Sequence, residues 1–302
     1  MTCGERARHP AGTVTRLAAI PPHALVLISI ISIQLGAAFS VTLFDTLPPI
    51  TVVFARLALA ALLLAIVIRP SVRTHLRRNW RLLLVYGATL AVLNACFYEA
   101  ISRIPLGIAV AIEFMGPLAV GVATSRRAQD FAWIALALAG LALLTPEIGA
   151  GLDPLGIMFA IISGTAWAGF VVLSQKIGKR IPGPDSLVIG IAVAALILAP
   201  LGAPTAVSVV HQLGDAGAFL GLALSILAIA VLSTAIPFFF EFTALQRMSA
   251  VVYGVLITLE PVVATIIGAI ALADWPGPLA LTAILCVTIA AAGASLTKRS
   301  EV

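Results

Sequence analysis

The sequence predicts an all-α polytopic membrane protein, with ten transmembrane helices arranged as two inverted five-helix repeats. The first observation is composition: 61% of the 302 residues are hydrophobic, 10% are charged, and the mean hydropathy is +1.12. One soluble core cannot bury that much apolar surface. The second observation is a series of apolar runs of about the length that crosses a bilayer as a helix. The third is a similarity between the two halves of the chain.

The apolar runs occur at ten places, which we take in chain order. We expect membrane-spanning helices at residues 24–44, 49–68, 81–100, 106–124, 131–146, 155–174, 187–203, 217–245, 250–271 and 278–296. The basic N-terminus followed by an apolar run resembles a signal peptide. Because the run is long and further spans follow, we expect it to be a retained first helix.

The basic residues predict the orientation in the membrane. All of the 18 Lys and Arg residues except Arg56 and Arg103 fall at ends of spans that would share one side. Positive residues favour the cytoplasmic side, so we expect both termini in the cytoplasm and the protein in a bacterial inner membrane. Topology then explains the net charge of +5 without a nucleic-acid partner. The basic loop 69–80 is expected to fix the orientation or to contact anionic lipid.

Two pairs of segments show that the halves are related. IISIQLGAAF (30–39) resembles IISGTAWAGF (161–170), and LALAALLLA (57–65) resembles IAVAALILA (191–199). Each half has five spans, an odd number, so the second half would enter the membrane from the opposite side. Inverted repeats are typical of secondary transporters, whose substrate sites lie near the bilayer midplane between the repeats.

The repeat divides the chain into five parts. These are a cytoplasmic tail (1–22), a first five-helix repeat (23–148), a linker (149–154), a second five-helix repeat (155–297) and a cytoplasmic tail (298–302).

The fourth span contains an acid next to a proline. Glu113 lies near the middle of PLGIAVAIEFMGPLAVGVATSRR (105–127), and Pro117 follows four residues later. A charge at the bilayer centre costs about 2.5–3.5 kcal/mol on insertion scales, and such a group usually faces a polar interior. Pro117 cannot donate a backbone hydrogen bond, so we expect it to bend the helix and to free the carbonyl of Glu113 as an acceptor for a substrate ammonium.

The ninth span repeats this arrangement with a shift. A slide of 144 positions places Pro117 on Pro261, but Glu260 falls one helical step away from the position of Glu113. Tyr253 lies seven residues before Glu260 and is expected on the same helix face. The two acids form either a structural pair, one of them neutralised by Arg56, or a site that exchanges protons or holds a substrate cation.

Arg56 is about eight residues into the second span. It either extends to the membrane surface or faces the interior, where arginine geometry suits a carboxylate or a substrate anion. We expect the interior position, with Arg56 paired more often to Glu260 than to Glu113.

Other polar and aromatic residues within spans are candidates for the same interior. Asn94, Trp167 and Gln34 either line a cavity or join helices. Glu241 follows Pro237, which is expected to break the eighth span, and its role stays open. Three residues have expected positions at span ends: Glu99 paired with Arg103, and Trp80 and Trp275 as interfacial anchors.

The sequence contains no hydrolytic, phosphate-binding or metal-binding motif, and no histidine lies within a span. Cys3, Cys96 and Cys286 are scattered, without metal or redox spacing. We therefore expect no enzyme activity, no cofactor and no metal. The expected partners are a small-molecule substrate, protons and membrane lipid, with the chain a monomer or a weak homodimer.

Several segments together resemble a known family. The fourth-span segment 105–127 followed by DFAW, with STAIPFFFEFTALQR and LEPVVA, is similar to the drug/metabolite transporter superfamily, EamA type, and within it to exporters of threonine and homoserine. Members commonly have Gly-Glu before the last span, where this chain has Ala273 and Asp274.

The resemblance implies an inner-membrane exporter of small hydroxylated amino acids, driven by the proton gradient. Arg56 would hold the substrate carboxylate, Glu113 or Glu260 its ammonium, and Asn94 or Ser32 its hydroxyl. The alternatives are an exporter of another metabolite or drug, such as a purine or a sugar, an intramembrane enzyme, and a passive channel.

Overall fold

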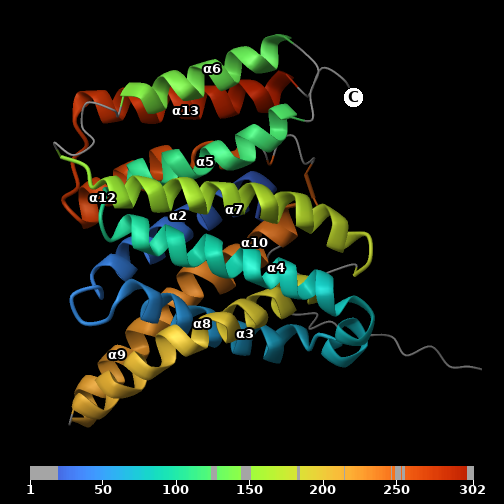
Figure 1. Cartoon of the computed structure of the whole chain (residues 1–302), viewed down its shortest axis with the longest axis vertical. Coiled ribbons are helices and arrows are strands. Elements are labelled where there is room, and N and C mark those ends of the chain that lie inside the picture. Colours follow the sequence, from blue (N-terminus) through green and yellow to red (C-terminus); the bar gives the residue numbers. More distant parts are fainter. Residues whose placement is uncertain are drawn as a thin grey trace, which may run out of the picture.

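A computed structural model describes most of the chain. The described residues are 20–123, 128–143, 151–181, 184–213, 215–245, 247–248, 253 and 256–297. Within them, every element of regular secondary structure is a helix (Figure 1). The elements are α2 (Pro22–Val41), α3 (Pro49–Ile68), α4 (Val72–Ile101), α5 (Leu106–Ala123), α6 (Ala128–Leu143), α7 (Pro154–Gly178), α8 (Asp185–Gln212), α9 (Ala216–Ala230), the π-helix η2 (Val231–Ala235), α10 (Ile236–Leu245), α12 (Glu260–Ala271) and α13 (Pro278–Thr297).

The described helices have the length and composition of a multi-pass membrane protein. Six helical segments are long and apolar enough to cross a membrane, and four shorter helices are also apolar. Several helices begin at a proline, including α2, α3 and α7. Proline is favoured in the first turn because its missing N–H would have no partner there. The predicted all-α polytopic fold is confirmed.

Several helix contacts have a counterpart when the two halves are exchanged. Counting α9, η2 and α10 as one span, α3 packs against α8, α5 against α12 and α6 against α13. The contact of α4 with α7 has its counterpart in α10 with α2, and that of α5 with α7 in α12 with α2. Each span of one half therefore packs against at least one span of the other half (Figure 1).

Two predicted boundaries are wrong. Helix α4 begins at Val72, so most of the predicted basic loop 69–80 is helical, with non-helical backbone at Asn79 (φ −133°, ψ 22°) where two helical pieces meet. Helix α8 continues to Gln212 through Pro200 and Pro204 instead of ending near residue 203. Prolines are tolerated within membrane helices because neighbouring groups and local adjustments satisfy the freed carbonyls.

The eighth span changes its helical geometry before Pro237. Helix α9 passes into η2, and η2 passes into α10. Pro237 has no N–H to donate to the carbonyl four residues earlier, so the backbone widens there. The hydrogen-bond pattern changes from α-helical to π-helical and back, and the span continues past this proline.

The other two prolines differ from each other. Helix α5 continues through Pro117, so this proline does not end the helix. In the ninth span, a turn at Thr258 and Leu259 precedes α12, which places Glu260 and Pro261 in its first turn. Glu260 is therefore at a helix N-terminus, where the dipole favours an acid, and not within a continuous helix. Residues 250–252 and 254–255 of this predicted span lie outside the described residues.

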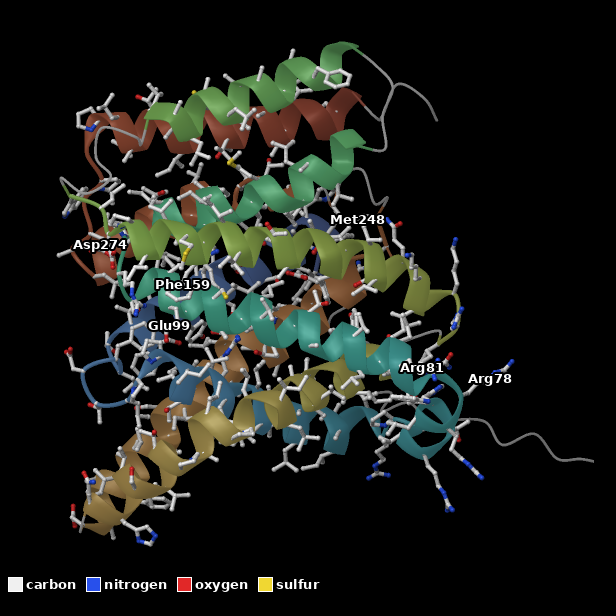
Figure 2. All side chains as sticks on the ribbon, viewed as in Figure 1. Arg78, Arg81, Glu99, Phe159, Met248 and Asp274 are labelled. Carbon is white, nitrogen blue, oxygen red and sulfur yellow. The ribbon has the colours of Figure 1, made fainter. Side chains whose placement is uncertain are left out.

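The outer surface is apolar along the helices and charged at the ends. Large side chains on the surface of the bundle include Leu62 (57% exposed), Leu196 (71%) and Ile270 (76%), as expected where lipid is the solvent. Arg78 and Arg81 lie at one end of the bundle, and Glu99 and Asp274 lie at the other (Figure 2). The tails 1–19 and 298–302 lie outside the described residues.

Candidate functional site

Arg56 of α3 is buried, with 5% of its surface exposed. Its Nη1 donates to Thr234 Oγ1 of η2 at 3.2 Å, and its Nη2 donates to Asn94 Oδ1 of α4. The Asn94 amide is held in turn by donation from Nδ2 to the Leu90 carbonyl at 2.8 Å. The guanidinium therefore joins three helices through neutral oxygens and does not extend to the membrane surface.

Tyr98 forms one wall of this site. The guanidinium carbon of Arg56 lies 4.8 Å from the ring centroid, which is a cation–π contact. Ser40 donates to the Gly36 carbonyl at 2.7 Å, so its oxygen can accept from the Tyr98 hydroxyl at 2.9 Å. Tyr98 is thus held by packing and by a hydrogen bond, and it orients the cation.

Unsatisfied polar atoms gather around η2. Among the described residues, the buried side-chain atoms without a hydrogen-bond partner are Gln34 Oε1, Thr51 Oγ1, Arg56 Nε and Ser233 Oγ. They belong to α2, α3 and η2, and η2 packs against both of the other helices. Buried polar atoms are nearly always satisfied in native proteins, so such a group indicates a place for a ligand or water.

The predicted ion pair of Arg56 is wrong. No carboxylate of the described residues forms an ion pair with its guanidinium, and its partners are Asn94, Thr234 and Tyr98. Glu260, in the first turn of α12, forms no ion pair with Arg56. The cation is left with neutral contacts only.

Glu113 lies in a second buried site on the other side of α4. Its carboxylate contacts the Ser163 hydroxyl of α7, and the same hydroxyl lies 2.9 Å from the Leu93 carbonyl. Leu93 precedes Asn94 in the chain, so adjacent residues of α4 contact the acid site and the cation site. The two sites are therefore linked through one turn of this helix.

The sequence predicts a free Glu113 carbonyl, but in the structure the backbone of α7 lies against this oxygen. A Cβ built on Gly164 of α7 would lie 2.7 Å from this oxygen, and one built on Gly116 would lie 1.8 Å from the Gly164 carbonyl oxygen. The backbones of α5 and α7 touch at these two glycines. No substrate ammonium fits between them, so the carbonyl cannot serve as its acceptor in this conformation.

Glu241 belongs to the same polar interior. Its Oε1 accepts from Ser29 of α2 at 2.7 Å, and its Oε2 accepts from Tyr253 at 3.0 Å. Glu260 is close enough to interact electrostatically with both Glu241 and Glu113. Tyr253 therefore contacts an acid. The turn at Thr258 and Leu259 separates it from Glu260, so their seven-residue spacing does not place them on one continuous helix face. The sequence signal for Glu241 was an acid within an apolar span, four residues after Pro237.

Two other candidate residues have structural contacts. Trp167 packs edge-on against Phe114, with ring centroids 5.4 Å apart, in an apolar cluster with α6 and α13. Ser32 donates to the Leu232 carbonyl at 2.7 Å. Asn94 and Ser32 are thus both engaged in helix contacts.

The end of the bundle carries the expected ion pair. Arg103 pairs with Glu99, and its Nε also lies 3.7 Å from Asp153 Oδ2. Among the described residues, no group of three or more His, Cys, Asp or Glu side chains is placed to hold a metal ion.

Apolar helices that surround a buried cation and several buried acids define a multi-pass membrane transporter. Comparison with known proteins gives the family. The model of the EamA-like transporter family matches residues 154–296. The threonine/homoserine exporter RhtA of Escherichia coli (strain K12) is 36% identical over 293 residues, which cover 96% of each chain. RhtA of Salmonella typhimurium (strain LT2) gives the same identity and coverage. The chain belongs to the EamA-like transporter family.

A solved structure supports the same fold. One crystal structure aligns with a TM-score of 0.57 at 19% identity and covers 92% of this chain and 99% of its own. At this identity the likeness concerns the fold alone.

Proposed function

We propose that this protein exports small amino acids of the threonine and homoserine kind across a bacterial inner membrane, by proton antiport with alternating access. The observation that carries the proposal is Arg56, a buried guanidinium with no carboxylate partner among the described residues. A substrate carboxylate would supply the missing negative charge in a geometry that arginine favours. The names of the relatives, threonine/homoserine exporters, support the substrate class.

The same polar interior offers groups for the rest of the substrate. The acids Glu113, Glu241 and Glu260 offer sites for the ammonium or for a proton. Gln34 Oε1 and Ser233 Oγ, which have no partner among the described residues, replace Asn94 and Ser32 as the groups for a substrate hydroxyl. A substrate without a hydroxyl, such as valine, would leave these two atoms without a hydrogen-bond partner. They would therefore favour hydroxylated substrates over valine-like ones.

The burial of the site supports alternating access. Arg56, Glu113 and Glu260 are 5%, 7% and 8% exposed, so a substrate reaches them only when helices move. The helix contacts that recur when the halves are exchanged support two inverted repeats at 23–148 and 155–297, joined by 149–154. Rocking of one repeat against the other would expose the site to each side in turn.

Arg56 variants test this proposal in liposomes by counterflow of labelled threonine and homoserine, with purines and cationic dyes as competitors. We expect Arg56→Ala to lose at least about 100-fold in transport, and Arg56→Lys to recover little because bidentate pairing is lost. Arg103→Ala, which removes an arginine at the end of the bundle, is the matched control. Near-normal counterflow by Arg56→Ala, or competition by purines but not by homoserine, would reject the proposed site or substrate.

A further inference from the structure

Two buried glutamates have the same local construction. Ser29 Oγ lies 2.7 Å from Glu241 Oε1 and 3.4 Å from the Pro237 carbonyl oxygen. Ser163 Oγ likewise contacts Glu113 Oε1 and the Leu93 carbonyl oxygen. In each case a hydroxyl from the first helix of one half, α2 or α7, lies between a carboxylate and a helix carbonyl.

A hydroxyl has one hydrogen, so it can donate to only one of these two acceptors. When the glutamate is ionised, the serine donates to it. When the glutamate is protonated, the acid can donate to the serine oxygen and the serine hydrogen can turn to the carbonyl. Both states keep every polar group satisfied, which is necessary for a buried group that gains and loses a proton.

Glu241 differs from Glu113 by a second donor. The Tyr253 hydroxyl donates to Oε2 at 3.0 Å, while Ser29 occupies Oε1. Two donors on two oxygens match the ionised form, because protonation would convert one oxygen from an acceptor into a donor. Tyr253 therefore supports the ionised form of Glu241, and Ser29 is the partner that can turn when a proton arrives.

The position of Glu241 suits a group that moves during transport. It lies on α10, directly after the π-helix η2 and Pro237, and π-helical segments often occur at functional sites and bends. Glu241 and its donors connect α10, α2 and residue 253. Loss of a proton would tighten this connection, and gain of a proton would loosen it.

We propose that Glu241 is a second proton-carrying residue of the transport cycle, with Ser29 and Tyr253 as the hydroxyls that respond to its ionisation. This rests on the proposed proton antiport. Glu241 is on α10 and contacts α2 and Tyr253, while Glu113 is on α5 and contacts α7. Glu260 is close enough to interact electrostatically with each of these acids.

The other charged and titratable groups near Glu241 are few. On α2, which packs against α10, His23 lies in the first turn. The π-helix η2 has no titratable residue. Tyr253 and Glu260 face Glu241 from the ninth span, and Arg247 follows α10 in the chain.

The test compares Glu241→Gln, Tyr253→Phe and Glu99→Gln with the unmodified protein in liposomes. Labelled threonine should accumulate in vesicles that are more acidic inside than outside. We expect Glu241→Gln to lose at least about tenfold of this accumulation, and its remaining threonine exchange to depend less on pH than exchange by the unmodified protein, because Glu113 still titrates. Glu99→Gln removes a carboxylate at the end of the bundle and should behave as the unmodified protein.

Tyr253→Phe tests whether Tyr253 acts on the ionisation of Glu241. If Tyr253 only held the helices together, the pH dependence of exchange would not change. Removing one donor disfavours the ionised form, so the pH of half-maximal exchange should rise by about one unit. This result decides the matter even if Glu241→Gln inserts but has no residual exchange.

The outcomes separate the two proposals. If Glu241→Gln accumulates threonine as Glu99→Gln does, or if Tyr253→Phe keeps the original pH profile, Glu241 is not a proton carrier. If the unmodified protein exchanges threonine but shows no accumulation under a pH gradient, proton antiport itself is rejected.

Discussion

Arg56 is costly where it lies. A charged residue near the bilayer centre costs about 2.5–3.5 kcal/mol on insertion scales. The oxygens of Asn94 and Thr234 and the ring of Tyr98 offset part of this cost, at about 1 kcal/mol for a typical contact. Its Nε has no acceptor among the described residues. The free energy of the site therefore improves when an anion enters, which is the property that a substrate site needs.

Asn94→Asp tests this property at the residue scale. The new carboxylate would pair with Arg56, so a substrate carboxylate would have to compete with it. We expect transport of subsaturating threonine to fall at least about tenfold, while the thermal unfolding temperature in detergent stays unchanged or rises. Counterflow and thermal unfolding measure the two effects.

The control for this substitution is Asn94→Ser, which removes the amide without adding a charge. It should lose less transport than Asn94→Asp and should be somewhat less stable. Full transport by Asn94→Asp would show that the guanidinium does not bind the substrate carboxylate.

At this scale the sequence identified the charges but not their partners. Arg56, Glu113 and Glu260 stand out because each is a charge within an apolar run. Partners depend on helix rotation and crossing, which one sequence does not contain: Thr234 is 178 positions from Arg56, and Glu241 is 212 positions from Ser29. The prediction that Arg56 pairs with an acid failed for this reason.

Close helix contact decides what Pro117 can do. Proline removes the donor to the Glu113 carbonyl, but the Gly116 and Gly164 contact brings α7 onto that oxygen. A carbonyl against a glycine Cα makes weak C–H···O contacts, so the freed group is used in packing. The loss of one backbone hydrogen bond follows from the sequence, whereas the approach of the α7 backbone depends on helix packing, which the sequence does not contain.

The segment before α13 holds the start of α5. Asp274 accepts a hydrogen bond from the Leu106 backbone N–H, the first residue of α5. This bond lowers the pKa of Asp274, while partial burial raises it by more. Asp274 stands where related transporters commonly have Glu, and here it caps a helix of the other half. The exchange of Glu for Asp therefore affects helix packing more directly than substrate choice.

Ala273 precedes this cap with a left-handed backbone, φ 58°. A residue with a Cβ pays about 1–2 kcal/mol for this conformation, and glycine pays little. Ala273→Gly should therefore raise the free energy of unfolding by about 0.5–1 kcal/mol after the greater entropy of the unfolded glycine is counted. Thermal unfolding in detergent measures the change.

Ala292→Gly within α13 is the matched control, and it should lower stability by about 1 kcal/mol because it is a helical position. Equal destabilisation by both substitutions would contradict the strain at residue 273.

Element boundaries show where sequence signals were weak. Apolar length predicted α3 at its observed bounds, because Pro49 and the end of the apolar run coincide with the helix ends. Pro200 and Pro204 did not end α8, since membrane helices accept proline, whereas Pro261 did coincide with a helix start. The same residue type thus has different outcomes that depend on neighbouring helices.

At the scale of the whole molecule, two serines repeat one contact between the halves. Ser32 of α2 donates to the Leu232 carbonyl of the eighth span at 2.7 Å. Ser163 of α7 lies 2.9 Å from the Leu93 carbonyl of the third span. Ser32 and Ser163 occupy the same place in the repeated segments IISIQLGAAF and IISGTAWAGF. The sequence repeat and the helix contacts therefore agree on how first and third spans meet across the two halves, which supports the inverted repeat.

The last prediction concerns orientation, which follows from charge at the two ends of the bundle. Arg78 and Arg81 lie at one end, and Glu99 and Asp274 lie at the opposite end (Figure 2). Positive residues next to span ends are retained in the cytoplasm, so the arginine end of α4 should face inward.

Reporter fusions at Val302 should then be active in the cytoplasm, and fusions at Gly151, between the two halves, should be active in the periplasm. The same two fusions in a variant with Arg73, Arg77 and Arg78 replaced by Gln test the cause. The difference between the two reporters should weaken measurably, because these arginines are exposed and do not contribute to the core. If Val302 and Gly151 report the same side, an odd number of spans does not separate them, and the two repeats cannot have opposite orientations.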